Sequence, residues 1–168
     1  MDVRFINPFI SAIKSVFETM VHTTVTVKKP EKVGEDHPAQ EVAGVIGLSG
    51  AVVGSVILGF SNDTAGKVAT AFAGIPIEQG HPDFADAIGE LANMVAGSAK
   101  AKFEGHNVSI SLPNVIVGKE HKVLHSQTCP RIQIPCDTPL GVVVVELGFR
   151  PEVKQSKSAP ALVGAAQS

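Results

Sequence analysis

The chain has 168 residues, 44% of them hydrophobic, with a formal net charge of -2 and a sequence pI near 6.3. This length can bury one good core but not two, so we expect one globular domain. Because the charge is nearly balanced and the longest basic run is the Lys28-Lys29 doublet, we expect neither nucleic acid nor an anionic membrane as partner. The apolar N-terminal stretch is interrupted by Arg4, Lys14 and Glu18, too often for a membrane span of about 20 apolar residues. We therefore predict a cytoplasmic protein.

Residues 1–40 predict a helix, a strand and a loop. Asn7 followed by Pro8 is typical of a helix start, and apolar residues at helical spacing extend this helix to about Val21. The alternating β-branched residues of 23–29 predict a strand. Glycine, proline and acidic residues then predict a loop over 31–40.

The next 30 or so residues predict a hairpin and a short helix. The Val- and Ile-rich run 41–60 contains the turn candidate LSGA at 48–51, which favours two paired strands. The segment 61–74 begins with the capping residues Ser, Asn and Asp and closes on Gly74, as a short helix would.

The C-terminal half predicts a third helix and three further strands, over 106–118, 131–137 and 140–150. Strands that follow one another through short turns favour an antiparallel sheet. We therefore predict an α+β fold, a mostly antiparallel sheet with helices packed on one face. The predicted domain spans 1–150, and the small, polar residues of 151–168 predict a flexible tail.

The third helix has a clear apolar stripe. At about 100° per residue, the residues that fall on one side are Phe84, Ile88, Leu91, Val95 and Ser98 or Ala99. We expect this stripe to face the core.

Glu90 and Asn93 fall on the opposite side of the same helix as i,i+3 neighbours. Small residues surround them, namely Gly89, Ala96, Gly97 and Ala101, although a glycine inside a helix costs about 0.8 to 1.0 kcal/mol relative to alanine. One explanation for these small residues is clearance, because another protein could then approach the carboxylate and the carboxamide closely. The alternative, simplest for the polar pair alone, is a solvent-exposed face without a role.

Other candidate sites are weaker. His121 and His125 have the spacing of a helical zinc pair, but they lie between predicted strands without the glutamate of a zinc protease. Asp83 and Asp86 could form an acidic cluster with Glu90, yet carboxylates near a helix start also complement the helix dipole. We predict no metal site, and the motifs of a self-contained hydrolase or nucleotide-binding enzyme do not stand out.

Two further patterns receive no role. Cys129 and Cys136 have no zinc-finger spacing, so we interpret them as buried thiols of a cytosolic protein. A second Glu-x-x-Asn, from Glu104 to Asn107, spans Gly105 at a predicted helix end, so its members should not share a helical face.

Four segments stand out together: INPFISAIKSVFETM near the start, the glycine-rich hairpin, SNDTAGKVATAFAG and, most specifically, DAIGELANMVAGSAK. In this combination the chain resembles the CheX branch of the CheC/CheX/FliY family of chemotaxis phosphatases, from about Arg4 to Phe149. The resemblance implies a phosphatase that acts on the aspartyl phosphate of a phosphorylated CheY-type response regulator. CheX-like members carry the Glu-x-x-Asn pair once and tend to form homodimers through their sheets. The first helix agrees with a single site, because Glu18 is followed three residues later by Val21.

The resemblance also assigns roles to residues. Asn93 would orient the attacking water, and Glu90 would pair with the active-site lysine of the receiver domain. Asp86, Gly89 and Gly97 would help the helix to dock. No cofactor of its own is implied, because the receiver domain is expected to bring Mg²⁺.

Two other functions stay open at this point. The domain could be an adaptor that docks a receiver domain without hydrolysing its phosphate, or a structural dimer in which the strand edges matter more than the helix. The presence of both Glu90 and Asn93 favours catalysis.

Overall fold

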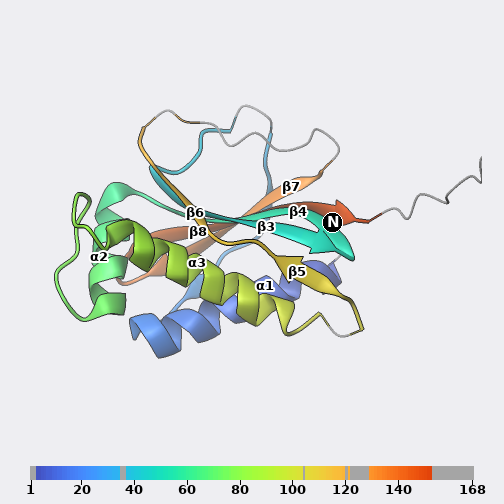
Figure 1. The fold of residues 1–168 in the computed structure, drawn as a ribbon, viewed down its shortest axis with the longest axis horizontal. Coiled ribbons are helices and arrows are strands. Elements are labelled where there is room, and N and C mark those ends of the chain that lie inside the picture. The colour runs from blue at the N-terminus through green and yellow to red at the C-terminus, as the bar shows by residue number, and fades with distance from the viewer. Residues whose placement is uncertain (1–2, 35–36, 104, 120, 122–128, 153–168) are drawn as a thin grey trace, which may run out of the picture.

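The structure, a computed structural model, describes residues 3–34, 37–103, 105–119, 121 and 129–152. One antiparallel sheet carries the helices α1, α2 and α3 on the same face (Figure 1), which confirms the predicted α+β class. In chain order the elements are α1 (Val3–Val16), the π-helical turn η1 (Phe17–Val21), β1 (Thr26–Val27), β2 (Glu31–Lys32), β3 (Val42–Gly50), β4 (Val52–Phe60), α2 (Asn62–Ala73), α3 (Phe84–Lys100), β5 (Val108–Ile110), β6 (Asn114–Val117), β7 (Arg131–Thr138) and β8 (Gly141–Pro151).

The strand order is β1-β7-β8-β4-β3-β5, with β2 also paired to β7 and β6 to β3, and every pairing is antiparallel. The predicted hairpin is confirmed as β3 and β4, which pair from Val42 opposite Phe60 to Leu48 opposite Gly54. β4 and β8 form the longest ladder, so the centre of the sheet joins the two halves of the chain.

The first helix begins earlier than predicted. It starts at Val3, and Pro8 lies inside it rather than in its first turn. The backbone hydrogen bond that Pro8 removes is tolerated because Pro8 is buried against the core together with Phe9 and Ile13. The helix ends where predicted, through η1, and His22 closes it in the left-handed conformation (φ 57°).

Two strand predictions were wrong in extent. The strand expected over 23–29 is reduced to the two residues of β1, and the loop expected over 31–40 contains β2. The strand expected over 106–118 is divided into β5 and β6, because Pro113 has no N–H to donate to a ladder. The short helix α2 agrees with the prediction: the Ser61 hydroxyl accepts from the Thr64 N–H at 3.2 Å, and Gly74 ends the helix with φ 72°.

The core lies between the helices and the sheet face that they cover. Its largest fully buried side chains are Phe9, Phe17, Phe60, Phe149, Ile13, Ile46, Ile77, Ile88, Leu91, Ile134, Leu147 and Val42. Cys136 belongs to this core, whereas Cys129 is only half-buried, and both are free thiols. No helix among the described residues is long and apolar enough to cross a membrane.

The C-terminal end of the described chain is part of the sheet. β8 reaches Pro151, and the Glu152 N–H donates to the carbonyl oxygen of Ala51 at 3.0 Å. The remaining residues of the predicted tail, 153–168, lie outside the described residues.

Candidate functional site

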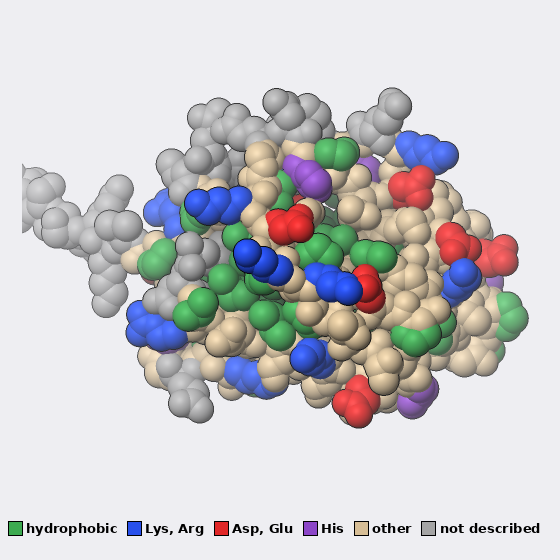
Figure 2. Space-filling model, turned by 180° about the vertical axis from the view of Figure 1, so that it is seen from behind, with side chains coloured by type: hydrophobic (Ala, Val, Ile, Leu, Met, Phe, Trp, Pro, Cys, Tyr) green, Lys and Arg blue, Asp and Glu red, His purple; other side chains and the backbone are tan. Residues whose placement is uncertain are grey.

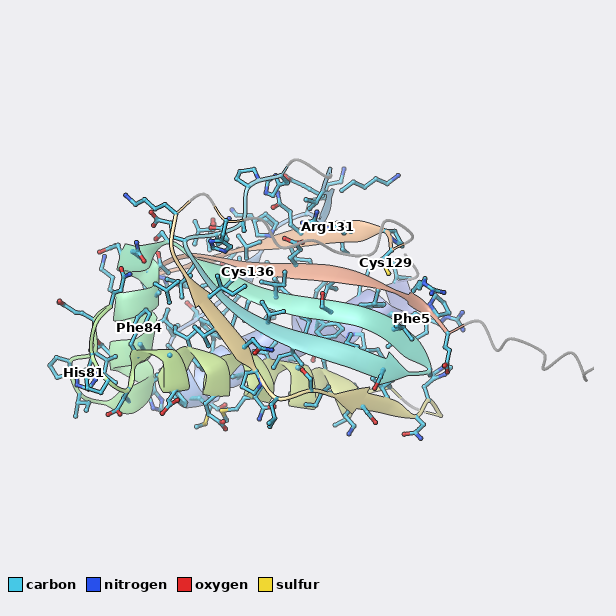
Figure 3. All side chains as sticks on the ribbon, turned by 45° about the horizontal axis from the view of Figure 1, so that its top comes forward. Phe5, His81, Phe84, Cys129, Arg131 and Cys136 are labelled. Atoms are coloured by element: carbon cyan, nitrogen blue, oxygen red, sulfur yellow. The ribbon has the colours of Figure 1, made fainter. Side chains whose placement is uncertain are left out.

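Helix α3 is fixed by its apolar stripe. Phe84, Ile88, Leu91, Val95 and Ala99 are all buried, as the helical wheel predicts, and Ser98 is half-buried. The helix packs on the sheet beside α1, with α2 near its N-terminal end (Figure 1). His81 and Phe84 mark that end in Figure 3, where Phe5 and Cys129 lie at the opposite end of the molecule.

The remaining side of α3 is accessible. We call it the outer face of α3 and define it by Asp86, Glu90, Asn93 and Gly97, which fall within about 60° of one another on the helical wheel. Asp86 and Glu90 are exposed, while Asn93 and Gly97 are half-buried. The outer face therefore presents two carboxylates and one carboxamide on a helix whose other side is anchored.

Glu90 and Asn93 have no hydrogen bond or ion pair with any other side chain in the described part of the chain. Both groups are therefore available to an external partner. The carboxylate can accept hydrogen bonds, and the carboxamide can accept and donate at the same time.

Gly97 fits the predicted clearance. A Cβ built on Gly97 would meet nothing within 4 Å, so the outer face is open there. Since the backbone of Gly97 is an ordinary helical one, its glycine is not required by conformation.

Gly89 has a different environment from the one that the sequence suggested. Gly89 is buried, and a Cβ on it would lie 3.4 Å from Pro113 Cγ and 3.4 Å from Val115 Cγ2. Ala96 is also buried, at 1% exposure. The predicted clearance around the polar pair is therefore wrong for Gly89 and Ala96, because both positions are buried inside the chain and do not face open space.

The segment that covers Gly89 was not found by sequence analysis. Residues 111–113 link β5 to β6, and Pro113 of this link lies against α3 at Gly89. The signal in the sequence was a proline inside an apparent strand, which marks an interruption, but its contact with α3 is long-range.

In the described part of the chain, the structure supports neither a zinc site at the histidines nor an acidic cluster at the start of α3. His121 Nδ1 lies 3.1 Å from the Gly118 carbonyl oxygen, while His125 lies outside the described residues. The Asp83 backbone N–H donates to His81 Nδ1 at 3.1 Å, and the Asp83 carboxylate lies 4.0 Å from the same nitrogen. Among the described residues, no group of three or more His, Cys, Asp or Glu side chains could hold a metal ion.

The second Glu-x-x-Asn motif and the cysteines gain no support as functional sites either. Glu104 lies outside the described residues, so that motif has no described geometry. Burial raises the pKa of the Cys136 thiol to about 11, and the neighbouring Asp137 carboxylate adds to the shift while Lys14 opposes it. A thiol with this pKa is protonated at neutral pH and is not a nucleophile.

The first helix carries no second pair. Glu18 is exposed on η1, but Val21, three residues later, is buried at 2% exposure. The described residues therefore contain one such pair, on α3.

Comparison with known proteins identifies a matching family and similar sequences. The family model described as "Chemotaxis phosphatase CheX" matches residues 42–137, which contain all of α2 and α3. A curated relative from Thermotoga maritima, named CheY-P phosphatase CheX, is 33% identical over 126 residues, covering 73% of this chain and 81% of the relative.

Solved structures share the fold. The chemotaxis protein CheX from Desulfovibrio desulfuricans superposes with a TM-score of 0.79 at 31% identity, covering 88% of this chain and 99% of that one. A CheX-CheY-BeF3-Mg²⁺ complex from Borrelia burgdorferi gives a TM-score of 0.71 over 87% of this chain and 97% of that one. At its 23% identity this second likeness shows the fold alone.

Proposed function

The chain belongs to the CheX family of chemotaxis phosphatases, and from that premise we propose that it hydrolyses the aspartyl phosphate of a CheY-type response regulator. The curated Thermotoga relative carries that activity in its name. The chain is accordingly an enzyme, a hydrolase of two-component signalling, and its substrate is another protein.

The observation that carries the proposed mechanism is the Glu90–Asn93 pair. The two side chains share the outer face of an anchored helix and have no partners within the described part of the chain. Both groups are therefore available to act on another protein, as the proposed mechanism requires.

The reaction requires few catalytic groups from the enzyme. An aspartyl phosphate is an activated acyl phosphate, so hydrolysis needs a water molecule held in line with the phosphorus rather than a protein nucleophile. The Asn93 carboxamide can accept a hydrogen bond from this water and donate one to a phosphoryl oxygen. Glu90, three residues before Asn93 on the same face, can pair with a lysine ammonium of the receiver domain and so fix the helix in register.

The rest of the outer face would serve docking. Asp86 adds a second carboxylate that can pair with a basic side chain of the partner, and the open space at Gly97 allows close approach. Gly89 would contribute indirectly, because its small size lets Pro113 lie against the helix. These docking roles belong to the proposal together with the catalytic pair.

A metal ion is expected to come from the partner. The receiver domain would hold Mg²⁺, which neutralises charge on the phosphoryl group, and α3 would supply only the water-positioning and pairing groups. A cytoplasmic location and a homodimer formed through the sheet are part of the same proposal.

The proposal is tested by the lifetime of a phosphorylated CheY-type receiver domain in Mg²⁺ buffer, with this protein at one-tenth of the receiver concentration. Release of inorganic phosphate beyond one equivalent of the protein is expected, because a catalyst turns over. If phosphate release keeps its spontaneous rate while the two proteins co-elute, the protein is a docking module and the enzymatic proposal is wrong.

A further inference from the structure

A pocket of about 590 Å³ opens where α1 begins and α3 ends, at the end of the molecule that Phe5 marks in Figure 3. We call it the α1–α3 pocket, and its lining includes Phe5, Pro8, Ser11, Lys102, Phe103 and His106. Lys100, the last residue of α3, follows Asn93 by seven residues, so the pocket lies roughly 10 Å or more along the helix axis from the Glu90–Asn93 pair. Its volume is within the range of small-molecule sites, about 300 to 1,000 Å³.

The floor of the α1–α3 pocket is aromatic and firmly packed. The Phe103 ring lies 5.8 Å from the Phe5 ring and 5.9 Å from the Phe9 ring, measured between centroids. Phe9 is fully buried and Phe103 is 7% exposed, whereas Phe5 is only partly buried and remains accessible. Because the core already fixes these rings, covering them with a ligand costs little additional conformational entropy.

Two polar side chains beside this floor can donate hydrogen bonds. The Lys102 ammonium donates to the Ser11 hydroxyl and so joins the residues after α3 to α1. An ammonium group carries three hydrogens, so two of them remain for a ligand. The His106 ring packs against Phe5, with 5.7 Å between the centroids, and it carries an N–H donor in either tautomer.

The charge of the α1–α3 pocket distinguishes it from another hollow of similar size. That hollow, about 660 Å³ beside α2, is lined by Lys67 and by the carboxylates of Asp63 and Glu78, and Lys67 is paired with Asp63 at 2.8 Å. On the side of the molecule seen in Figure 2, basic and acidic side chains also lie next to one another. By contrast, the described residues that line the α1–α3 pocket include no acidic side chain, and Arg4 adds another basic one.

We propose that the α1–α3 pocket binds a small organic anion that carries a planar apolar ring. The ring lies against Phe5 and Phe103, and a carboxylate, phosphate or sulfonate group accepts hydrogen bonds from Lys102 and His106. The ring contributes apolar burial, and the charged group fixes the orientation of the ligand. The site is separate from the outer face of α3, so the inference does not rest on the proposed phosphatase activity.

The experiment titrates the full chain with 1-naphthalenesulfonate, which joins a planar ring to an anionic group. Inorganic sulfate supplies the charge alone, and 1-naphthalenemethanol supplies the ring alone. We expect saturable binding of one sulfonate per chain with a Kd of about 1 mM or below, and at least roughly ten-fold weaker binding of the other two compounds. The backbone amide signals of Phe5, Ser11 and Lys102 should shift during this titration.

The variant Lys102→Gln tests the charged side of the pocket. It should weaken binding of the sulfonate roughly ten-fold, because it removes a charge-assisted hydrogen bond. Lys67→Gln is the matched control, since it removes the same charge at the other hollow, and it should keep the Kd within about two-fold. Urea denaturation of both variants separates a folding defect from a binding defect.

Three results would overturn the inference. The first is the absence of saturable sulfonate binding to wild type up to about 10 mM. The second is equal affinity for sulfate or for the alcohol, because either the rings or the charges would then have no part in binding. The third is an equal loss of affinity in Lys67→Gln and Lys102→Gln, which would indicate non-specific attraction. No receiver domain is present in these titrations, so failure of the phosphatase proposal would leave their outcome unchanged.

Discussion

Gly44 on β3 lies directly beneath Ala92 on α3, so closely that a Cβ on Gly44 would stand 2.7 Å from the Cβ of Ala92. The same atom would stand 3.4 Å from the carbonyl oxygen of Ile88. Helix α3 therefore packs directly against the backbone of β3 at Gly44, with no side chain of that residue between them. Because Ala92 directly precedes Asn93, the position of the carboxamide depends on a glycine in a strand that is far away in the sequence.

A Gly44→Val substitution should therefore displace α3 without altering any residue of its outer face. We expect the free energy of unfolding to fall by roughly 1 to 3 kcal/mol, as for other overpacked cores. A displacement near 1 Å should also lower the dephosphorylation rate by about 100-fold. Gly47→Ala is the control, since its Cβ would meet only the Ser111 side chain, at 3.4 Å. Full activity of a folded Gly44→Val protein would contradict this dependence.

The two glycines of α3 should respond differently to substitution. Gly97→Leu places a large side chain into open space, so we expect an unchanged or slightly raised stability together with loss of receiver binding. Gly89→Leu must displace Pro113 and Val115, so it should lower the free energy of unfolding by about 1 to 3 kcal/mol. Chemical denaturation and a binding titration of both variants measure this contrast. Normal binding by Gly97→Leu would show that the outer face does not approach the partner.

The ion pair between Arg131 and Glu146 joins β7 and β8, and their side chains are only 13% and 10% exposed. Replacing Arg131 with methionine leaves the buried Glu146 carboxylate without this cation, so we expect a loss of about 3 to 5 kcal/mol in unfolding free energy. The exposed pair Lys28–Asp137 is the control, with side chains 52% and 51% exposed. Lys28→Met should cost no more than about 1 kcal/mol. Equal losses for the two variants in urea denaturation would refute the burial argument.

The thiol of Cys136 should make stability depend on alkaline pH. Its pKa is raised from 9.0 to about 11, mainly by burial, so the protonated thiol is favoured in the folded state. The contribution is complete below pH 9, where both states hold the proton, and it is lost as the pH rises to about 11, where the unfolded chain has ionised. Two pKa units correspond to about 3 kcal/mol. The free energy of unfolding of wild type should fall more steeply across this range than that of Cys136→Ala, and parallel curves would contradict the shift.

Local patterns predicted much of this fold. The stripe of α3 from Phe84 to Ala99 followed from helical periodicity, and the caps of α2 followed from Ser61 and Gly74, because these signals act between residues that are close in the chain. The start of α1 was missed for a non-local reason: burial of Pro8 offsets a local preference for the first turn.

The site was predicted only in part for the same reason. The orientation of Glu90 and Asn93 is a property of one helix and could be read from its wheel. The contact of Gly89 with Pro113 and the burial of Arg131 against Glu146 depend on tertiary packing, which no local pattern encodes. The sequence shows that position 89 is a glycine, which is unusual inside a helix. Only the structure shows that Pro113 lies against it.

The most direct measurement is the decay of a phosphorylated CheY-type receiver domain in Mg²⁺ buffer with wild type, Asn93→Ala, Glu90→Ala and the control Ser98→Ala. Asn93→Ala should lower the rate of dephosphorylation about 100-fold, because the side chain that positions the water is lost. The Kd for the receiver domain should stay the same. Glu90→Ala should weaken binding and its salt dependence, because it removes a charged pair. Ser98→Ala should behave as wild type. A folded Asn93→Ala protein that dephosphorylates the receiver domain at the wild-type rate would contradict the assignment of catalysis to α3.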